Sequence, residues 1–251
     1  MLKKVFFNPL FGDKFPKEWM DGFVENVQRL KDYGWYWKIF TPHDIKSKGN
    51  VEFIKMDIDE FNDRIEKVTG INPHNYIDGP GPHKLVSEYY PANGLIFEDY
   101  ARGFDFWGHC NWDLVYGRLE KYLPDHFFDD CDIFGNDPNA INGIFSLYRN
   151  IPKVNHLFER HPHWKKVFED INTQYTFDEQ MFTVTVREAQ EEGYIRFKHA
   201  WMLQYDRQVN HKPKPDLTIK PTGALVDKNG EEMMIFHFSF TKEWPEIKYG
   251  K

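Results

Sequence analysis

Strand-like and helix-like segments alternate from the first residue, and this alternation restricts the possible folds more than any other feature of the sequence. The β-branched and aromatic runs KKVFF, WYWKIFT and VEFIKM predict strands at residues 3–7, 35–41 and 51–56. Helical patterns separate these runs or follow them. Such an order predicts an α/β fold with an open, mostly parallel sheet flanked by helices, as in Rossmann-like domains, and a nucleotide-type site at the carboxyl ends of its strands.

Two helices are expected in this first part of the chain. Apolar residues recur at spacings of three and four over residues 17–32, and Gly34 follows as a stop signal. A second helix is predicted over FNDRIEKV, with Asp59 as its N-cap and Gly70 just beyond its end.

The rest of the chain reads as shorter elements. Residues 72–91 are rich in Pro, Gly and Asn and predict loops. Strands are expected at FDFWG, DIFG and GIFSLY, and helical turns at GRLEKYLP, VNHLFER, HWKKVFED and after FDEQMFT. Near the end, Asn229-Gly230 predicts a hairpin turn with positive φ angles, followed by an apolar strand that contains His237.

Composition limits the class of protein. With 251 residues, 41% of them hydrophobic, and no flexible linker, we expect residues 1–251 to form a single domain. A formal charge of −7 predicts no general attraction to nucleic acid or anionic membranes. Two cysteines, no signal-peptide core and no apolar run of about 20 residues favour a cytoplasmic protein without a transmembrane segment.

The segment FWGHCNWDLVYG carries the first candidate site. Asn111 and Asp113 follow an aromatic strand, and their oxygens at positions i and i+2 can hold a hard divalent cation that bridges a diphosphate. Taken alone, such a triplet is more often a turn or a helix cap. His237 interrupts an apolar strand and needs a partner, so it is either a hydrogen-bonded core residue or a third ligand; the mixed N/O set would suit Mn²⁺ better than Ca²⁺. Lys242, just beyond, is either a solvated lysine or a partner for phosphate.

A second acidic group lies in YTFDEQMF. Asp178 and Glu179 stand at the apparent start of a helix, where they either complement the helix dipole or act as a catalytic base or acceptor-binding carboxylate. Asp132, at the entry to DIFG, is a weaker candidate for chemistry.

The order of these motifs resembles small bacterial and viral GT-A-type glycosyltransferases. VFFNPLFGDKFPKEW is similar to their opening strand, Phe-Gly loop and helix, and HKLVSEYYPANGLIFEDYARGFDFWGHCNWDLVYGRLEKYL looks like the segment that carries their Asp-x-Asp motif. NGIFSLYRN, FDE and FHFSFTKEW resemble their later motifs, in the same order. The likeness implies a GT-A-like domain, with about residues 1–110 binding the nucleotide sugar and about 111–251 the acceptor.

The resemblance also implies roles for individual residues. Asn111, Asp113 and His237 would hold a divalent metal (Mn²⁺ or Mg²⁺), and the first two would also bind the diphosphate of the donor, a UDP-sugar being the expected one. Asp178 or Glu179 would be the base or would fix the acceptor. Other donor contacts are expected from Phe11, Gly12, Thr41, Lys84 and Lys242.

One departure from the family pattern leaves the function open. Asn111 stands where the family usually has Asp, so one negative charge is missing from the expected metal site. The sequence therefore predicts a metal-assisted transferase that moves a sugar from a nucleoside diphosphate to a hydroxyl acceptor: a glycan or another hydroxyl compound, a nucleic acid not being excluded. The alternative is a non-catalytic carbohydrate or nucleotide-sugar binding module with a decayed metal site; a metal-dependent phosphodiesterase is a distant third.

Overall fold

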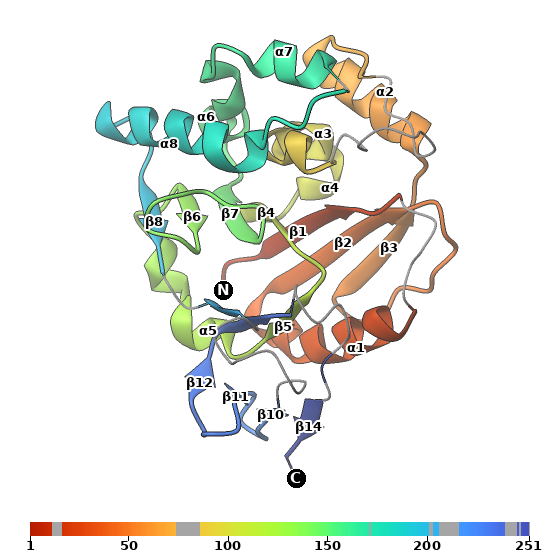
Figure 1. Cartoon of the computed structure of the whole chain (residues 1–251), viewed down its shortest axis with the longest axis vertical. Coiled ribbons are helices and arrows are strands. Elements are labelled where there is room, and N and C mark those ends of the chain that lie inside the picture. The colour runs from red at the N-terminus through yellow and green to blue at the C-terminus, as the bar shows by residue number, and fades with distance from the viewer. Residues whose placement is uncertain are drawn as a thin grey trace.

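The computed structural model describes residues 1–11, 17–73, 86–170, 172–200, 203–205, 216–238, 245 and 247–250. Its centre is a seven-stranded sheet in the order β3-β2-β1-β4-β7-β6-β8 (Figure 1). Neighbouring strands are parallel except at β7, which is antiparallel to β4 and to β6. The predicted open, mostly parallel sheet is therefore confirmed. Its strands are β1 (Lys4–Pro9), β2 (Trp35–Thr41), β3 (Val51–Lys55), β4 (Phe106–Cys110), β6 (Ile133–Gly135), β7 (Phe145–Arg149) and β8 (Phe197–His199).

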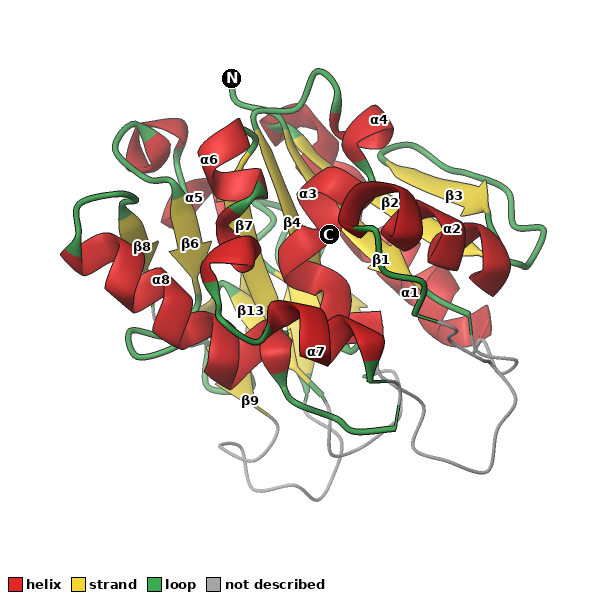
Figure 2. Ribbon diagram, turned by 90° about the horizontal axis from the view of Figure 1, so that it is seen from above, coloured by secondary structure: helices red, strands yellow, loops and turns green. Residues whose placement is uncertain are grey.

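Helices cover both faces of this sheet, because its central strands are buried on both sides. In β1, Val5 and Phe7 belong to one buried cluster while Phe6 belongs to the other. The first face packs against helices that lie in front of the strands in Figure 2, namely α2 (Ile58–Thr69), α3 (Asn93–Ile96), α6 (Pro152–Asn155), α7 (Trp164–Glu169) and α8 (Phe182–Glu191). The second face packs against α1 (Lys17–Val27) and α5 (Leu119–Tyr122).

The predicted helix boundaries hold with two adjustments. α1 ends at Val27, and the chain continues to Gly34 as a 3₁₀-helix, Gln28–Tyr33; Gly34 stops it with a φ of 81°. The prediction that Asp59 caps the next helix is wrong. Asp57 has the extended backbone of a cap, and its carboxylate accepts the Glu60 N–H at 2.8 Å, which places Asp59 inside the first turn.

The prediction of loops over residues 72–91 is wrong in its last part. Residues 74–85 lie outside the described ranges, but Val86–Ala92 forms a 3₁₀-helix, η2, that leads through α3 into α4 (Glu98–Ala101). In the next strand, the run FDFWG enters the sheet only at Phe106, and pairing continues to Cys110. None of the helices in the described ranges has the length and apolarity needed to span a membrane.

Two smaller sheets complete the structure. One contains β5 (Leu114–Tyr116), β13 (Ile235–His237) and β9 (Leu203–Tyr205); the other contains β12 (Glu232–Met233), β11 (Leu225–Val226), β10 (Leu217–Ile219) and β14 (Ile247–Tyr249). The predicted hairpin exists as β11 and β12, although of Asn229 and Gly230 only the glycine has a positive φ, 83°. The chain then changes sheets at Met234, so the strand that contains His237 pairs with β5 instead.

Candidate functional site

The carboxyl ends of the central strands form the edge where Asn111 and Asp113 lie. The Asn8 side chain at the end of β1 donates to the carbonyl oxygen of Cys110 at the end of β4, so these two strand ends are tied together. Asn111 then donates its backbone N–H to the carbonyl oxygen of Ile144 at 2.9 Å. Trp112 packs edge-to-face on Phe23 of α1, with ring centroids 5.5 Å apart. The turn after β4 is therefore anchored on both sides.

Asp113 and His237 meet although 124 residues separate them in the sequence. β13 pairs with β5 in antiparallel register, with His237 opposite Leu114, and Phe238 donates its N–H to the carbonyl oxygen of Asp113 at 3.0 Å. This register places His237 Nε2 at 3.0 Å from Asp113 Oδ1. Both side chains are largely buried, so the pair is a well-fixed N/O donor set at the exit of β4.

A cavity of about 200 Å³ adjoins this turn and brings Asn111 together with the second acidic group. Gly143 borders it closely: a Cβ at this position would lie 2.7 Å from Asp178 Oδ2. The Gly143 N–H donates to Glu179 Oε1 at 3.2 Å. Every other lining residue has a polar side chain: Ser87, Tyr90, Asn111, Gln174, Thr176, Asp178 and Glu179.

One carboxyl group of this cavity, that of Asp178, has an unusual pKa. Burial raises the pKa of Asp178 to about 8, and the nearby charges of Glu179 and Glu88 raise it in the same direction. Asp178 is 6% exposed. At neutral pH it is therefore mostly a neutral acid that can donate a hydrogen bond. A strongly perturbed carboxyl group inside a polar cavity is typical of a functional site.

An aromatic ring that lines the cavity is stacked on a buried imidazole ring of the central sheet. Tyr90 stacks on His109 of β4, with ring centroids 4.6 Å apart. His109 is fully buried, and burial lowers its pKa to about 4, so the ring is neutral; its Nε2 donates to the Asn142 carbonyl oxygen at 3.2 Å. This contact holds residue 142, next to Gly143, against the sheet.

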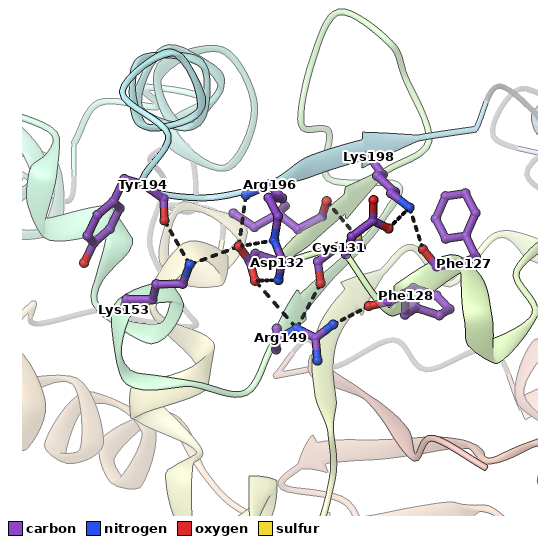
Figure 3. A network of polar contacts seen from close by, with 11 residues as sticks. Phe127, Phe128, Cys131, Asp132, Arg149, Lys153, Tyr194, Arg196 and Lys198 are labelled. Carbon is purple, nitrogen blue, oxygen red and sulfur yellow. Dashed lines mark hydrogen bonds and ion pairs between the residues drawn. The ribbon is translucent and has the colours of Figure 1, made fainter.

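Asp132, the weaker candidate, belongs to a different network (Figure 3). It is 1% exposed, and its carboxylate accepts hydrogen bonds from Arg196 and from Lys153 Nζ at 3.0 Å. Arg149 lies 3.6 Å away. Because Asp132 precedes β6, it lies at the opposite end of the strands from the cavity, and its role is to tie β6 to β8 and α6.

The remaining predicted residues are placed as follows. Phe11 is 6% exposed and packs on Phe61 of α2, with ring centroids 5.2 Å apart. Thr41 is buried at the carboxyl end of β2, where its hydroxyl accepts the His43 N–H at 3.3 Å. Outside the described residues lie Gly12, Lys84 and Lys242.

Several cavity residues were not singled out from the sequence. Ser87 and Tyr90 line the cavity but fall in a stretch that was interpreted as loop. Both belong to the segment beginning HKLVSEYY, which resembles the Asp-x-Asp region of GT-A-type glycosyltransferases. Gly143 is the second residue of the run NGIFSLYRN, which resembles a glycosyltransferase motif, and only its close approach to Asp178 distinguishes it. Nothing in the sequence indicated that Gln174 and Thr176 would line the cavity.

Comparison with known proteins gives one family match. A model described as "Family of unknown function (DUF6625)" matches residues 6–221. The sequence matches no protein with a curated description.

Solved structures similar to this chain include glycosyltransferases. A galactosyltransferase, LgtC, in complex with donor and acceptor sugar analogs is 10% identical over 94% of this chain and 87% of its own, with a TM-score of 0.48. Core-mannan synthase A from Aspergillus fumigatus, in an Mn/GDP form, is 7% identical over 74% of this chain and 70% of its own, with a TM-score of 0.38.

Proposed function

Because the chain belongs to DUF6625, a family of unknown function, we propose its function from its own site: a glycosyltransferase that moves a sugar from a nucleoside diphosphate to a hydroxyl acceptor with the help of a divalent metal ion. One observation carries this proposal. The Asp113–His237 pair lies at the exit of β4, and Asn111, two residues away, lines a polar cavity together with Asp178 and Glu179. The proposal takes residues 1–251 as one domain, with about 1–110 binding the donor and about 111–251 the acceptor.

The donor atoms of the pair fit a divalent ion. Neighbouring ligands of an octahedral ion with bonds of about 2.1 Å lie about 3 Å apart, and Asp113 Oδ1 and His237 Nε2 are separated by 3.0 Å. A carboxylate, an imidazole and the amide oxygen of Asn111 would form a mixed N/O set of the kind that suits Mn²⁺. The described residues contain no cluster of three or more His, Cys, Asp or Glu side chains that could hold a metal ion. The proposed site therefore takes its third ligand from the amide oxygen of Asn111.

Each group of the site then has a task in the transfer. When bound, the ion would act as a Lewis acid toward the departing nucleoside diphosphate. Asn111, Asp113 and His237 would hold the ion next to the diphosphate of the donor. Glu179 would be the general base that accepts the proton of the acceptor hydroxyl. Asp178, neutral at pH 7, would donate a hydrogen bond to a sugar oxygen.

Thermal unfolding with a panel of nucleoside diphosphate sugars, with and without Mn²⁺, tests the proposal. A ligand that binds only the folded protein stabilises it by about 2.7 kcal/mol at a hundred times its dissociation constant. We expect a UDP-sugar to raise the unfolding temperature only with metal present. Asp113→Ala should abolish this shift and sugar transfer, whereas Asp129→Ala, which removes an exposed carboxylate, should leave both intact.

The same panel separates the alternative. If free saccharides stabilise the protein and nucleotide sugars do not, the chain is a carbohydrate-binding module. If Asp113→Ala retains full transfer activity, the Asp113–His237 pair is a structural hydrogen bond and the proposed metal site is wrong.

A further inference from the structure

Glu88 is a fully buried carboxylate next to the candidate site, and it was not singled out from the sequence. It lies on η2 between Ser87 and Tyr90, which line the cavity, yet it does not line the cavity itself. Its Oε1 accepts the N–H groups of Tyr175 at 2.6 Å and Thr176 at 2.9 Å. Its Oε2 accepts the N–H of Phe177 at 2.7 Å. One side chain thus binds three successive backbone N–H groups, as an anion does in a backbone nest.

The turn that Glu88 binds has an unfavourable backbone. Thr176 has φ 52° and ψ 43°, and it is the one non-glycine residue with a positive φ in the described part of the chain. A β-branched residue adopts this left-handed conformation only when its surroundings impose it. The three hydrogen bonds to Glu88 are the interactions that impose it here.

This turn leads directly into the acidic part of the cavity. Phe177–Met181 forms one turn of π-helix, which contains Asp178 and Glu179. π-Helical turns are rare and occur frequently at functional sites. Because the N–H of Phe177 is one of the three that Glu88 binds, the position of Asp178 depends on Glu88 through a single peptide unit.

Resting on the proposed transferase function, we propose that Glu88 is a positioning residue for the transfer: it holds the turn at residues 175–177 and thereby sets Asp178 and Glu179 against the substrate. An apolar side chain would fill the same space without the cost of burying a carboxylate. The three N–H groups are shared between two acceptor oxygens of one side chain, which an apolar residue cannot supply. Misplacement of a catalytic group by about 1 Å costs on the order of a hundredfold in rate.

Glu88→Gln tests this role with almost no change in volume. The amide keeps one oxygen acceptor but presents a donor to the remaining N–H, so the turn loses at least one hydrogen bond. We expect kcat for sugar transfer to fall at least tenfold. The KM for the donor should change less than threefold, because Asp113 and His237 do not depend on this turn.

Asp132→Asn is the matched control, since Asp132 is also a buried, multiply hydrogen-bonded carboxylate but lies away from the cavity. It should lower the unfolding temperature and leave kcat within twofold of wild type. If Glu88→Gln does not fold, Glu88→Asp keeps the charge and shortens the reach, and the same loss in kcat is expected from it.

The outcomes separate the two proposals. An unchanged kcat in a folded Glu88 variant, or an equal loss of kcat in Asp132→Asn, would overturn the positioning role while leaving the transferase function in place. A wild-type protein that transfers no sugar from any nucleotide donor would instead overturn the transferase function, and the role of Glu88 with it.

Discussion

Replacing Asp178 by Asn should make the folded protein more stable at neutral pH. The pKa of this carboxyl group is raised from 3.8 to about 8 by burial and by the charges of Glu179 and Glu88. In the unfolded chain the group ionises freely above pH 4. The folded protein therefore holds a proton that the unfolded chain has lost, and the free energy of unfolding falls as the pH rises between these two values.

The size of this effect follows from the gap between the two pKa values. One pKa unit corresponds to about 1.4 kcal/mol, and pH 7 lies about three units above the ordinary value. Asp178→Asn removes the ionisation and keeps the shape, so it should raise the free energy of unfolding by about 4 kcal/mol at pH 7. Near pH 4 the two proteins should differ by less than about 1 kcal/mol, and above pH 8 the difference should level off.

Urea unfolding of wild type and variant between pH 4 and pH 9, in a metal chelator, measures this difference. Asp129→Asn, at an exposed position, serves as the control and should show no pH-dependent gain. The reasoning is refuted if Asp178→Asn is less stable than wild type at pH 7. It is equally refuted if the difference stays constant across the pH range. A gain in stability with a loss of activity would mark Asp178 as a residue kept for function.

Two further changes test the surroundings of the site. Burial alone would raise the pKa of Asp132, but hydrogen bonds from Arg196 and Lys153 outweigh it and lower this pKa to about 2. Asp132→Asn should therefore lower the free energy of unfolding, measured with urea, by about 2 kcal/mol at pH 7. This loss should disappear as the pH falls from 4 to 2. A loss that stays constant with pH would contradict the ion network. Gly143→Ala places a methyl group 2.7 Å from Asp178 Oδ2, so kcat/KM for transfer should fall at least tenfold, and an unchanged value would show that the reaction does not use this cavity.

Most of the central sheet was predictable because its signals are local. β1 is buried along its whole length and β2 along most of it, and Gly34 and Gly70 end the helical segments that precede them with φ angles of 81° and 72°. The N-cap was misassigned to Asp59 because the sequence offers acidic residues at 57 and 59, and only the backbone conformation distinguishes them. The hairpin turn was found, but not the change of sheet at Met234, because nothing local specifies which strand will pair next.

The candidate site was partly predictable for the same reason. Asn111 and Asp113 stand out as polar groups at the end of an aromatic strand, and Asp178 and Glu179 as an acidic pair between apolar residues. The meeting of Asn111, Asp178 and Glu179 at one cavity, and the unusual pKa of Asp178, depend on residues from distant segments. Glu88 in particular has no local signal, since a glutamate in a loop-like stretch is ordinarily solvated.

The sequence by itself determined the periodicities, the strand and helix stops and the residue types at the strand ends, because these depend on contacts between neighbours in the chain. Only the tertiary structure decided that β13 pairs with β5 in the register that brings His237 to Asp113, and that η2 packs where Glu88 can bind the turn at residues 175–177. Pairing register and buried hydrogen bonds join segments roughly ninety residues or more apart. They follow from the packing of the whole chain, which local propensity does not specify.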